Sequence, residues 1–183
     1  MANERVVWKT PVLQTRWHPP DPPRFKMNVD ATNFNDLRAM GAGMVLQDSQ
    51  GVLLVAMCKR ILANLSALDA EAKSMEIAVQ FAWELGFRKV YFETDFSSLK
   101  NILTSLSNAP ASLETITDNI LAQLDRFCFV SFGHVKREGN RPAHILAQFA
   151  KQVGDFVVWL EETPNLIENT CSQDVAPFIS EVI

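Results

Sequence analysis

Three acidic residues lie where a folded chain would favour an apolar side chain. Asp30 ends the strand-like run FKMNVDA, Glu71 lies on the apolar face of a predicted helix in LDAEAKSMEIAV, and Asp95 follows the strand-like run KVYFET. Burying unpaired carboxylates costs free energy, and repulsion among them adds to that cost. A fold that gathers them therefore needs a compensating cation. Carboxylate oxygens suit Mg²⁺, with Mn²⁺ as an alternative, and two such ions about 4 Å apart can activate water for phosphodiester cleavage.

Each acid also has a purely structural interpretation. Asp30 could be a turn residue after a strand, and Asp95 could cap the next helix in competition with the serines that follow it. Glu71 is harder to explain in this way, because an unpaired Glu on an apolar stripe needs a reason. Glu93 shares strand parity with Asp95 and is interpreted as a solvated charge at a sheet edge.

Alternating and helical patterns of apolar residues predict the elements that would position these acids. Strands are predicted at 25–31, 41–48, 51–58, 88–94 and 127–135. Helices are predicted at 66–85, 96–106, 113–124 and 142–153. The first helix begins with a capping box at Ser66–Asp69 and stops at Gly86. Its apolar stripe comprises Met75, Ala78, Val79, Ala82 and Leu85.

The order of these elements predicts an α/β fold. We expect a mixed five-stranded sheet, with three antiparallel strands and then two parallel ones, flanked by helices. The first strand should be a central neighbour of the parallel strands, which would bring Asp30 close to Asp95. Residues 1–24, which include WHPPDPP, are predicted to be an extended Pro-rich lead-in, 25–154 the folded domain, and 155–183 a C-terminal tail that packs on the domain or trails from it.

The composition fits one globular domain. The chain has 183 residues, 48% hydrophobic and 21% charged, and its apolar runs are interrupted before membrane-spanning length. Its N-terminus lacks the long apolar run of a secretory signal, and three widely spaced cysteines suit reduced thiols. We therefore expect an intracellular, non-secreted monomer, with nucleus and cytoplasm not distinguished. The net charge of −4 argues against a general electrostatic grip on nucleic acid, so any such contact must be local.

Four short stretches, NVDA, AEA, ETD and HVKREGNRPAHILA, together resemble the type 1 ribonuclease H domain in its reverse-transcriptase-like version, common in plant genomes and retroelements. The resemblance covers about Phe25–Gly154. It implies a ribonuclease H-like fold and metal-dependent endonucleolytic hydrolysis of RNA in RNA–DNA hybrids, with Mg²⁺ held by Asp30, Glu71 and Asp95. The alternative is a catalytically weak or inactive module of the same fold that binds nucleic acid or protein.

The resemblance also implies roles for two histidines. The family's fourth acid follows an Asn by four residues, and here His144 stands in that place after Asn140. A neutral imidazole cannot supply the same charge, although it could hold or relay a water. His134 lies ten residues before His144, a separation similar to that of the family's mobile general-acid histidine. It could instead be an ordinary strand residue.

A polar and basic segment flanks the start of the last predicted helix. Lys136, Arg137, Asn140 and Arg141 are the predicted nucleic-acid-binding residues. Their basic side chains could contact a phosphate backbone. The alternative is a solvated basic turn.

Overall fold

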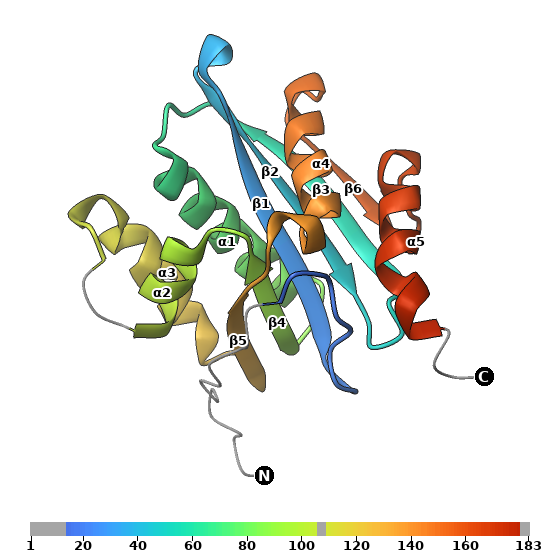
Figure 1. The fold of residues 1–183 in the computed structure, drawn as a ribbon. Coiled ribbons are helices and arrows are strands. Elements are labelled where there is room, and N and C mark those ends of the chain that lie inside the picture. The colour runs from blue at the N-terminus through green and yellow to red at the C-terminus, as the bar shows by residue number, and fades with distance from the viewer. Residues whose placement is uncertain (1–13, 106–108, 180–183) are drawn as a thin grey trace.

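A six-stranded mixed sheet forms the centre of the protein (Figure 1). The computed structural model describes residues 14–105 and 109–179. In the spatial order β5-β4-β1-β2-β3-β6, β2 and β3 form an antiparallel meander with β1, and β4 and β5 run parallel to β1. The strands are β1 Phe25–Phe34, β2 Ala39–Gln47, β3 Leu53–Ile61, β4 Lys89–Thr94, β5 Phe129–His134 and β6 Phe156–Leu160. The predicted mixed α/β sheet is confirmed, but its predicted count of five strands is one short, because β6 pairs with the outer edge of β3.

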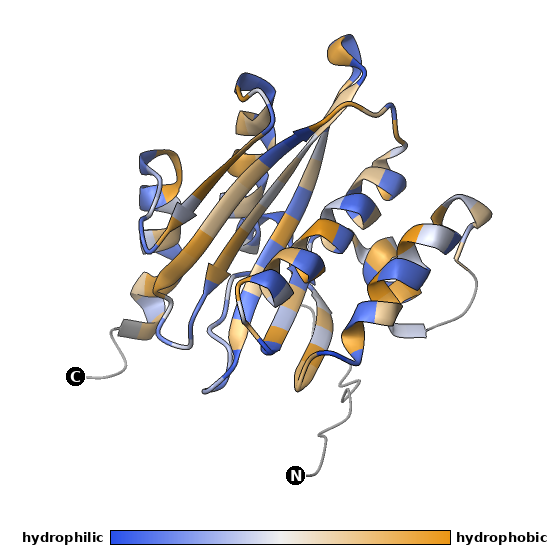
Figure 2. Cartoon of the chain, turned by 180° about the vertical axis from the view of Figure 1, so that it is seen from behind, coloured by the Kyte–Doolittle hydropathy of each residue, from blue (hydrophilic) through white to orange (hydrophobic). Residues whose placement is uncertain are grey.

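Helices cover both faces of the sheet. They are α1 Ala67–Glu84, α2 Ser97–Ser105, α3 Glu114–Leu124, α4 Arg141–Phe149 and α5 Asn165–Ile179. Single 3-10 turns lie at Asn35–Leu37, Ala111–Leu113, Arg137–Gly139 and Ala150–Gln152. Helices α1, α2 and α3 share one hydrophobic core, and α4 and α5 share a second core on the opposite face. Figure 2 shows the largely hydrophobic strands between helices that carry both hydrophobic and hydrophilic residues. Four of these helices match the predicted ones closely, although predicted residue 106 lies outside the described residues, and α5 was not predicted.

Helix α1 begins and ends where the sequence predicts. The Ser66 hydroxyl accepts a hydrogen bond from the Asp69 backbone N–H at 3.1 Å, and Gly86 beyond the C-cap has a φ of +89°. The buried stripe runs as far as Ala82, whereas Leu85 is exposed. Glu71 belongs to the buried side of this helix. Within 14–105 and 109–179, neither α1 nor any other helix is long and apolar enough to cross a membrane.

Both sides of β1 are buried. Met27 and Val29 face the core that contains α1, and Lys26, Asn28 and Asp30 alternate with them and so point to the face covered by α4. All five residues are less than 5% exposed. The predicted alternation is therefore correct, but the polar side of the strand does not face solvent.

The lead-in packs against this polar side. Gln14 forms a parallel bridge with Val135, and Trp17 is only 1% exposed. Residues 1–13 of the predicted lead-in lie outside the described residues. The division of the chain into lead-in, domain and tail stays a prediction.

Helix α4 lies unusually close to the sheet. A Cβ at Gly43 of β2 would stand 2.1 Å from the Ala143 carbonyl oxygen, so only glycine permits this approach. The contact sets how closely the first turn of α4, which carries His144, approaches the sheet.

Candidate active site

The topology brings Asp30 and Asp95 to one edge of the sheet. Strands β1 and β4 are parallel neighbours, and their pairing ends with Val29 opposite Thr94. Asp30 and Asp95 are the residues that directly follow Val29 and Thr94 along the sequence. Because β4 stops there while β1 continues to Phe34, the gap at the carboxyl end of β4 leaves room for side chains from other elements.

Glu71 enters this gap from α1. Its Oε1 accepts a hydrogen bond from the Ala31 backbone N–H at 3.3 Å. Ala31 lies just beyond the last β1 residue that pairs with β4. The carboxylate therefore satisfies a backbone donor and is held beside Asp30.

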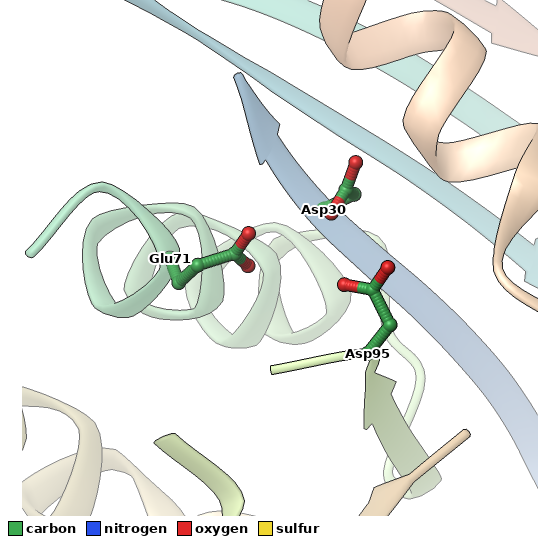
Figure 3. Close-up of side chains that lie close together, drawn as sticks. All are labelled: Asp30, Glu71 and Asp95. Atoms are coloured by element: carbon green, nitrogen blue, oxygen red, sulfur yellow. The ribbon is translucent and has the colours of Figure 1, made fainter. Parts of the chain in front are cut away.

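The three carboxylates converge, as Figure 3 shows. One oxygen from each of Asp30, Glu71 and Asp95 lies within 4.8 Å of the others, and we call these residues the acid cluster. The Asp30 and Glu71 side chains are almost completely buried, and the Asp95 side chain is 6% exposed. Asp30 Oδ1 and Glu71 Oε2 have no hydrogen-bond partner among the described residues. Asp30 lies inside β1 and Asp95 bonds to an arginine, so the turn and helix-cap interpretations do not describe them.

Burial and mutual repulsion raise the pKa values in the acid cluster. The pKa of Asp30 rises to about 6, chiefly through burial and then through the charge of Asp95. The pKa of Glu71 rises to about 9, chiefly through burial and then through the charges of Asp30 and Asp95. Carboxylates that resist ionisation in the absence of a cation, with two unpartnered oxygens among them, fit a site for a hard divalent ion such as Mg²⁺.

His144 and Arg137 border the acid cluster. His144 Nδ1 lies 2.6 Å from Asp30 Oδ2. Arg137 Nε donates to Asp95 Oδ2, and its Nη1 lies 3.1 Å from His144 Nε2 and 2.8 Å from Nδ1. An ionised Asp30 can only accept and a guanidinium can only donate, so we assign Nδ1–H as the donor to Asp30 and Nε2 as the acceptor from Arg137. The His144 ring therefore lies between the Asp30 carboxylate and the Arg137 guanidinium.

The predicted site residues His134, Lys136 and Arg141 are not members of the acid cluster and lie in three different surroundings. His134 Nε2 lies 3.1 Å from the backbone oxygen of Asp95, a bond that joins the ends of β5 and β4. Lys136 is exposed. Arg141 helps to line a hollow between the lead-in and α5, where its charge acts on Asp174.

Asn140 is not on the surface. It is fully buried, and its Nδ2 donates to the Val29 carbonyl oxygen at 3.0 Å. In this structure its side chain is part of the core between α4 and β1, where nucleic acid cannot reach it.

The interpretation of Glu93 as a solvated edge charge is wrong. Its side chain is 9% exposed and its Oε1 lies 2.7 Å from Lys26 Nζ. Strand parity placed Glu93 on one side of β4, but nothing in β4 itself indicated that this side is covered. Lys26 was missed, and the available signal was its position on the same side of β1 as Asp30.

Comparisons with known proteins agree with this fold. A family model described as reverse transcriptase-like matches residues 28–150, and no curated protein matches the chain. Among solved structures, RNase H1 from the halophilic archaeon Halobacterium salinarum NRC-1 has a TM-score of 0.65 and 22% identity, covering 70% of this chain and 98% of that one.

Two further structures are similar. The N-terminal RNase H domain of a Mycobacterium tuberculosis protein has a TM-score of 0.63 and 17% identity over 69% of this chain and 98% of that one. LC11-RNase H1, isolated from compost and solved in complex with an RNA/DNA hybrid, has a TM-score of 0.62 and 17% identity over 69% of this chain and 95% of that one. At these identities the structural likeness establishes the fold.

Proposed function

Because the chain belongs to the reverse transcriptase-like family and has the ribonuclease H fold, we propose that it hydrolyses the RNA strand of RNA–DNA hybrids with a divalent cation. One observation carries the proposal: three carboxylates from β1, α1 and the end of β4 converge to within 4.8 Å in a nearly completely buried site. The substrate class is suggested by the relative that was solved with an RNA/DNA hybrid.

The acid cluster would hold the cation. Asp30 Oδ1 and Glu71 Oε2 lack partners among the described residues, and Asp95 supplies a third carboxylate oxygen within 4.8 Å of those of the other two acids. Divalent ions supply charge neutralisation at a phosphodiester and help to deprotonate water. Mg²⁺ suits three carboxylates, and Mn²⁺ has similar preferences.

The neighbouring residues would orient the acids and the substrate. By donating Nδ1–H to Asp30 Oδ2, His144 would orient the carboxylate and leave the unpartnered Asp30 Oδ1 available to hold a cation. Arg137 is 55% exposed, so its guanidinium can bond to Asp95 and still reach a phosphate oxygen. His134 would hold the end of β4 through the Asp95 carbonyl, a positioning role and not proton transfer.

The direct test uses a labelled hybrid. Purified protein with millimolar Mg²⁺ or Mn²⁺ should release short RNA products from an RNA–DNA hybrid and none from the same RNA alone. Products should disappear with EDTA. Intact RNA under both metals would refute the proposed activity.

The second candidate is a binding module with little or no activity. His144 in the place of the expected fourth acid and the net charge of −4 favour it. The same assay separates the two candidates, since a binding module would retain the hybrid without cleaving it.

Arg137→Ala is expected to weaken recognition of the phosphate backbone. KM for the hybrid should rise, and the dependence of log KM on log salt concentration should lose a slope of about 1, as for one lost phosphate contact. Lys89→Ala is the matched control, because Lys89 is exposed at the opposite end of β4. If the salt slope is unchanged in Arg137→Ala, Arg137 does not contact phosphate and acts only through its bond to Asp95.

His144→Asp is expected to strengthen metal binding. A fourth carboxylate adds negative charge beside Asp30 and can still accept from Arg137. The Mg²⁺ concentration for half-maximal cleavage should fall on the order of tenfold, as for other changes next to metal ligands. His18→Asp, an exposed change in the lead-in, should leave it unchanged. A higher Mg²⁺ requirement in His144→Asp would show that the imidazole is needed as such.

A further inference from the structure

A buried ion pair crosses from β1 to β4 beside the acid cluster. Lys26 Nζ lies 2.7 Å from Glu93 Oε1, and the two side chains are 5% and 9% exposed. Burying both charges costs several kcal/mol in desolvation, and such pairs often stabilise a protein no more than apolar residues would. The pair therefore calls for an explanation other than stability.

The ion pair leads directly to α4. Asn28 Nδ2 lies 3.3 Å from Glu93 Oε2 and 3.2 Å from Asn140 Oδ1. Asn140 Nδ2 donates to the Val29 carbonyl, one residue before Asp30. Lys26, Glu93, Asn28 and Asn140 thus form a continuous chain of bonds, which we call the polar network.

The acceptors at the two ends of the polar network, the Glu93 carboxylate and the Val29 carbonyl, fix the direction of its bonds. A carboxylate can only accept, so Asn28 must turn its amide N–H₂ toward Glu93 and also toward Asn140 Oδ1. Asn140 is then left with its own N–H₂ to donate to Val29. This orientation costs free energy, because it leaves Asn28 Oδ1 buried and without a hydrogen-bond partner among the described residues.

The polar network ends at His144. Asn140 is the N-cap residue of α4, and its carbonyl oxygen accepts from the His144 backbone N–H at 3.1 Å. The side chain of His144 then donates to Asp30. Fixing Asn140 against β1 therefore fixes the distance between His144 and Asp30.

Neighbouring residues cover the ion pair on both sides. The Trp17 ring lies 5.8 Å from Lys26 Nζ, and a Cβ at Gly133 would stand 3.2 Å from Glu93 Cγ. Because Trp17 covers Lys26 and Gly133 lies beside Glu93, the two charged side chains are closely packed and bond to each other directly. A direct bond transmits position better than one that water could replace.

We propose that Lys26 and Glu93 are positioning residues, which act through Asn28 and Asn140 to hold His144 in its bond to Asp30. Part of this inference rests on the proposed hydrolysis, since a displaced His144 would alter the rate. The position of His144 itself is independent of that activity.

The test variant is Lys26→Met/Glu93→Gln, which removes both charges and leaves neither one buried alone. The matched control is Lys73→Met/Glu76→Gln, which removes the 2.6 Å ion pair on α1. The chain has three histidines, so the imidazole signals of His144 can be assigned by NMR in the full chain. They should shift in the test variant and stay in place in the control.

Activity gives a second readout. The test variant should lower kcat about tenfold with little change in KM, which corresponds to about 1.4 kcal/mol. In a His144→Ala background the same double change should cost little, because the residue it positions is absent. A purely structural role would give the same loss in both backgrounds.

The outcomes separate the two proposals. An unmoved His144 signal, or equal losses of kcat in both backgrounds, would overturn the positioning role. A shifted signal in a protein that never cleaves hybrid would leave the positioning role standing and end the proposed function. If the double variant does not fold, Asn28→Ser interrupts the polar network with the ion pair intact, and it must shift the His144 signals in the same way.

Discussion

Asp30→Asn is expected to reduce hybrid cleavage by at least about 10³-fold. The substitution keeps the size of the side chain and one oxygen but removes the charge at the centre of the acid cluster, where Asp30 is fully buried. Metal-based charge stabilisation contributes several kcal/mol to a transition state, and each 1.4 kcal/mol is a factor of ten in rate. The loss should appear in kcat at saturating hybrid, measured with labelled RNA at fixed Mg²⁺.

The control for this change is Asp118→Asn. Asp118 is exposed on α3, so the same loss of charge outside the acid cluster should leave the rate within about twofold, as surface substitutions usually do. Asp95→Asn should behave like Asp30→Asn, because both carboxylates belong to the acid cluster. Comparable rates in Asp30→Asn and Asp118→Asn would refute the proposed site.

Glu71→Gln is expected to stabilise the protein without metal and to remove its response to metal. In EDTA at pH 8 the Tm should rise by at least about 3 °C, since about 1 kcal/mol moves the Tm of a domain of this size by about 2–4 °C. The reason is that Glu71 must take up a proton on folding at pH 8 or bury its charge, whereas Gln does neither and its Oε1 can still accept from the Ala31 N–H. Thermal unfolding with and without 10 mM Mg²⁺, about the working concentration of such assays, is the measurement.

The pH dependence follows from the direction of the pKa shifts. The pKa of Glu71 is about 9 in the folded protein against an ordinary value of 4.5, so the folded state holds the extra proton between these pH values. Stability from this group is complete below pH 4.5 and is lost as pH rises through 9. The raised pKa of Asp30 changes the stability with the same sign, between pH 3.8 and about pH 6. The Tm advantage of Glu71→Gln should therefore shrink toward pH 4.5.

Bound Mg²⁺ should offset the Tm advantage of Glu71→Gln over the wild-type protein. A bound divalent ion stabilises only the state that binds it, so Mg²⁺ should raise the Tm of the wild-type protein and leave Glu71→Gln nearly unchanged. If EDTA gives Glu71→Gln a lower Tm than wild type at pH 8, burial of this carboxylate is not the cost that we infer.

The acid cluster could be predicted because Glu71 violates a local pattern and because the motifs around all three acids together resemble a known family. Glu71 interrupts an apolar helix stripe, and Asp30 and Asp95 follow strand-like runs. The approach of Asp30 to Asp95 then follows from the parallel pairing of β1 and β4, and Glu71 joins them because the buried side of α1 packs on β1. Patterns of period 2 and 3.6 identify such elements whenever one face is apolar.

Other features depend on what covers a face, and local patterns do not contain that information. Glu93 is buried because the lead-in, with Trp17, and the start of α4 cover its side of the sheet. Arg137 and Asn140 are three residues apart, yet Arg137 bonds to Asp95 and Asn140 is buried against β1, and their spacing alone does not indicate this difference. Strand β6 is apolar at all five positions, so it lacks the alternation that reveals a strand.

The position of a bound divalent ion tests the central claim most directly. Crystals grown with Mn²⁺ and measured at its absorption edge would locate the ion by anomalous scattering. We predict a peak about 2 Å from carboxylate oxygens of Asp30, Glu71 and Asp95, which is absent in Asp30→Asn. A fully ordered acid cluster without a peak, or an ion bound only elsewhere, would contradict the account.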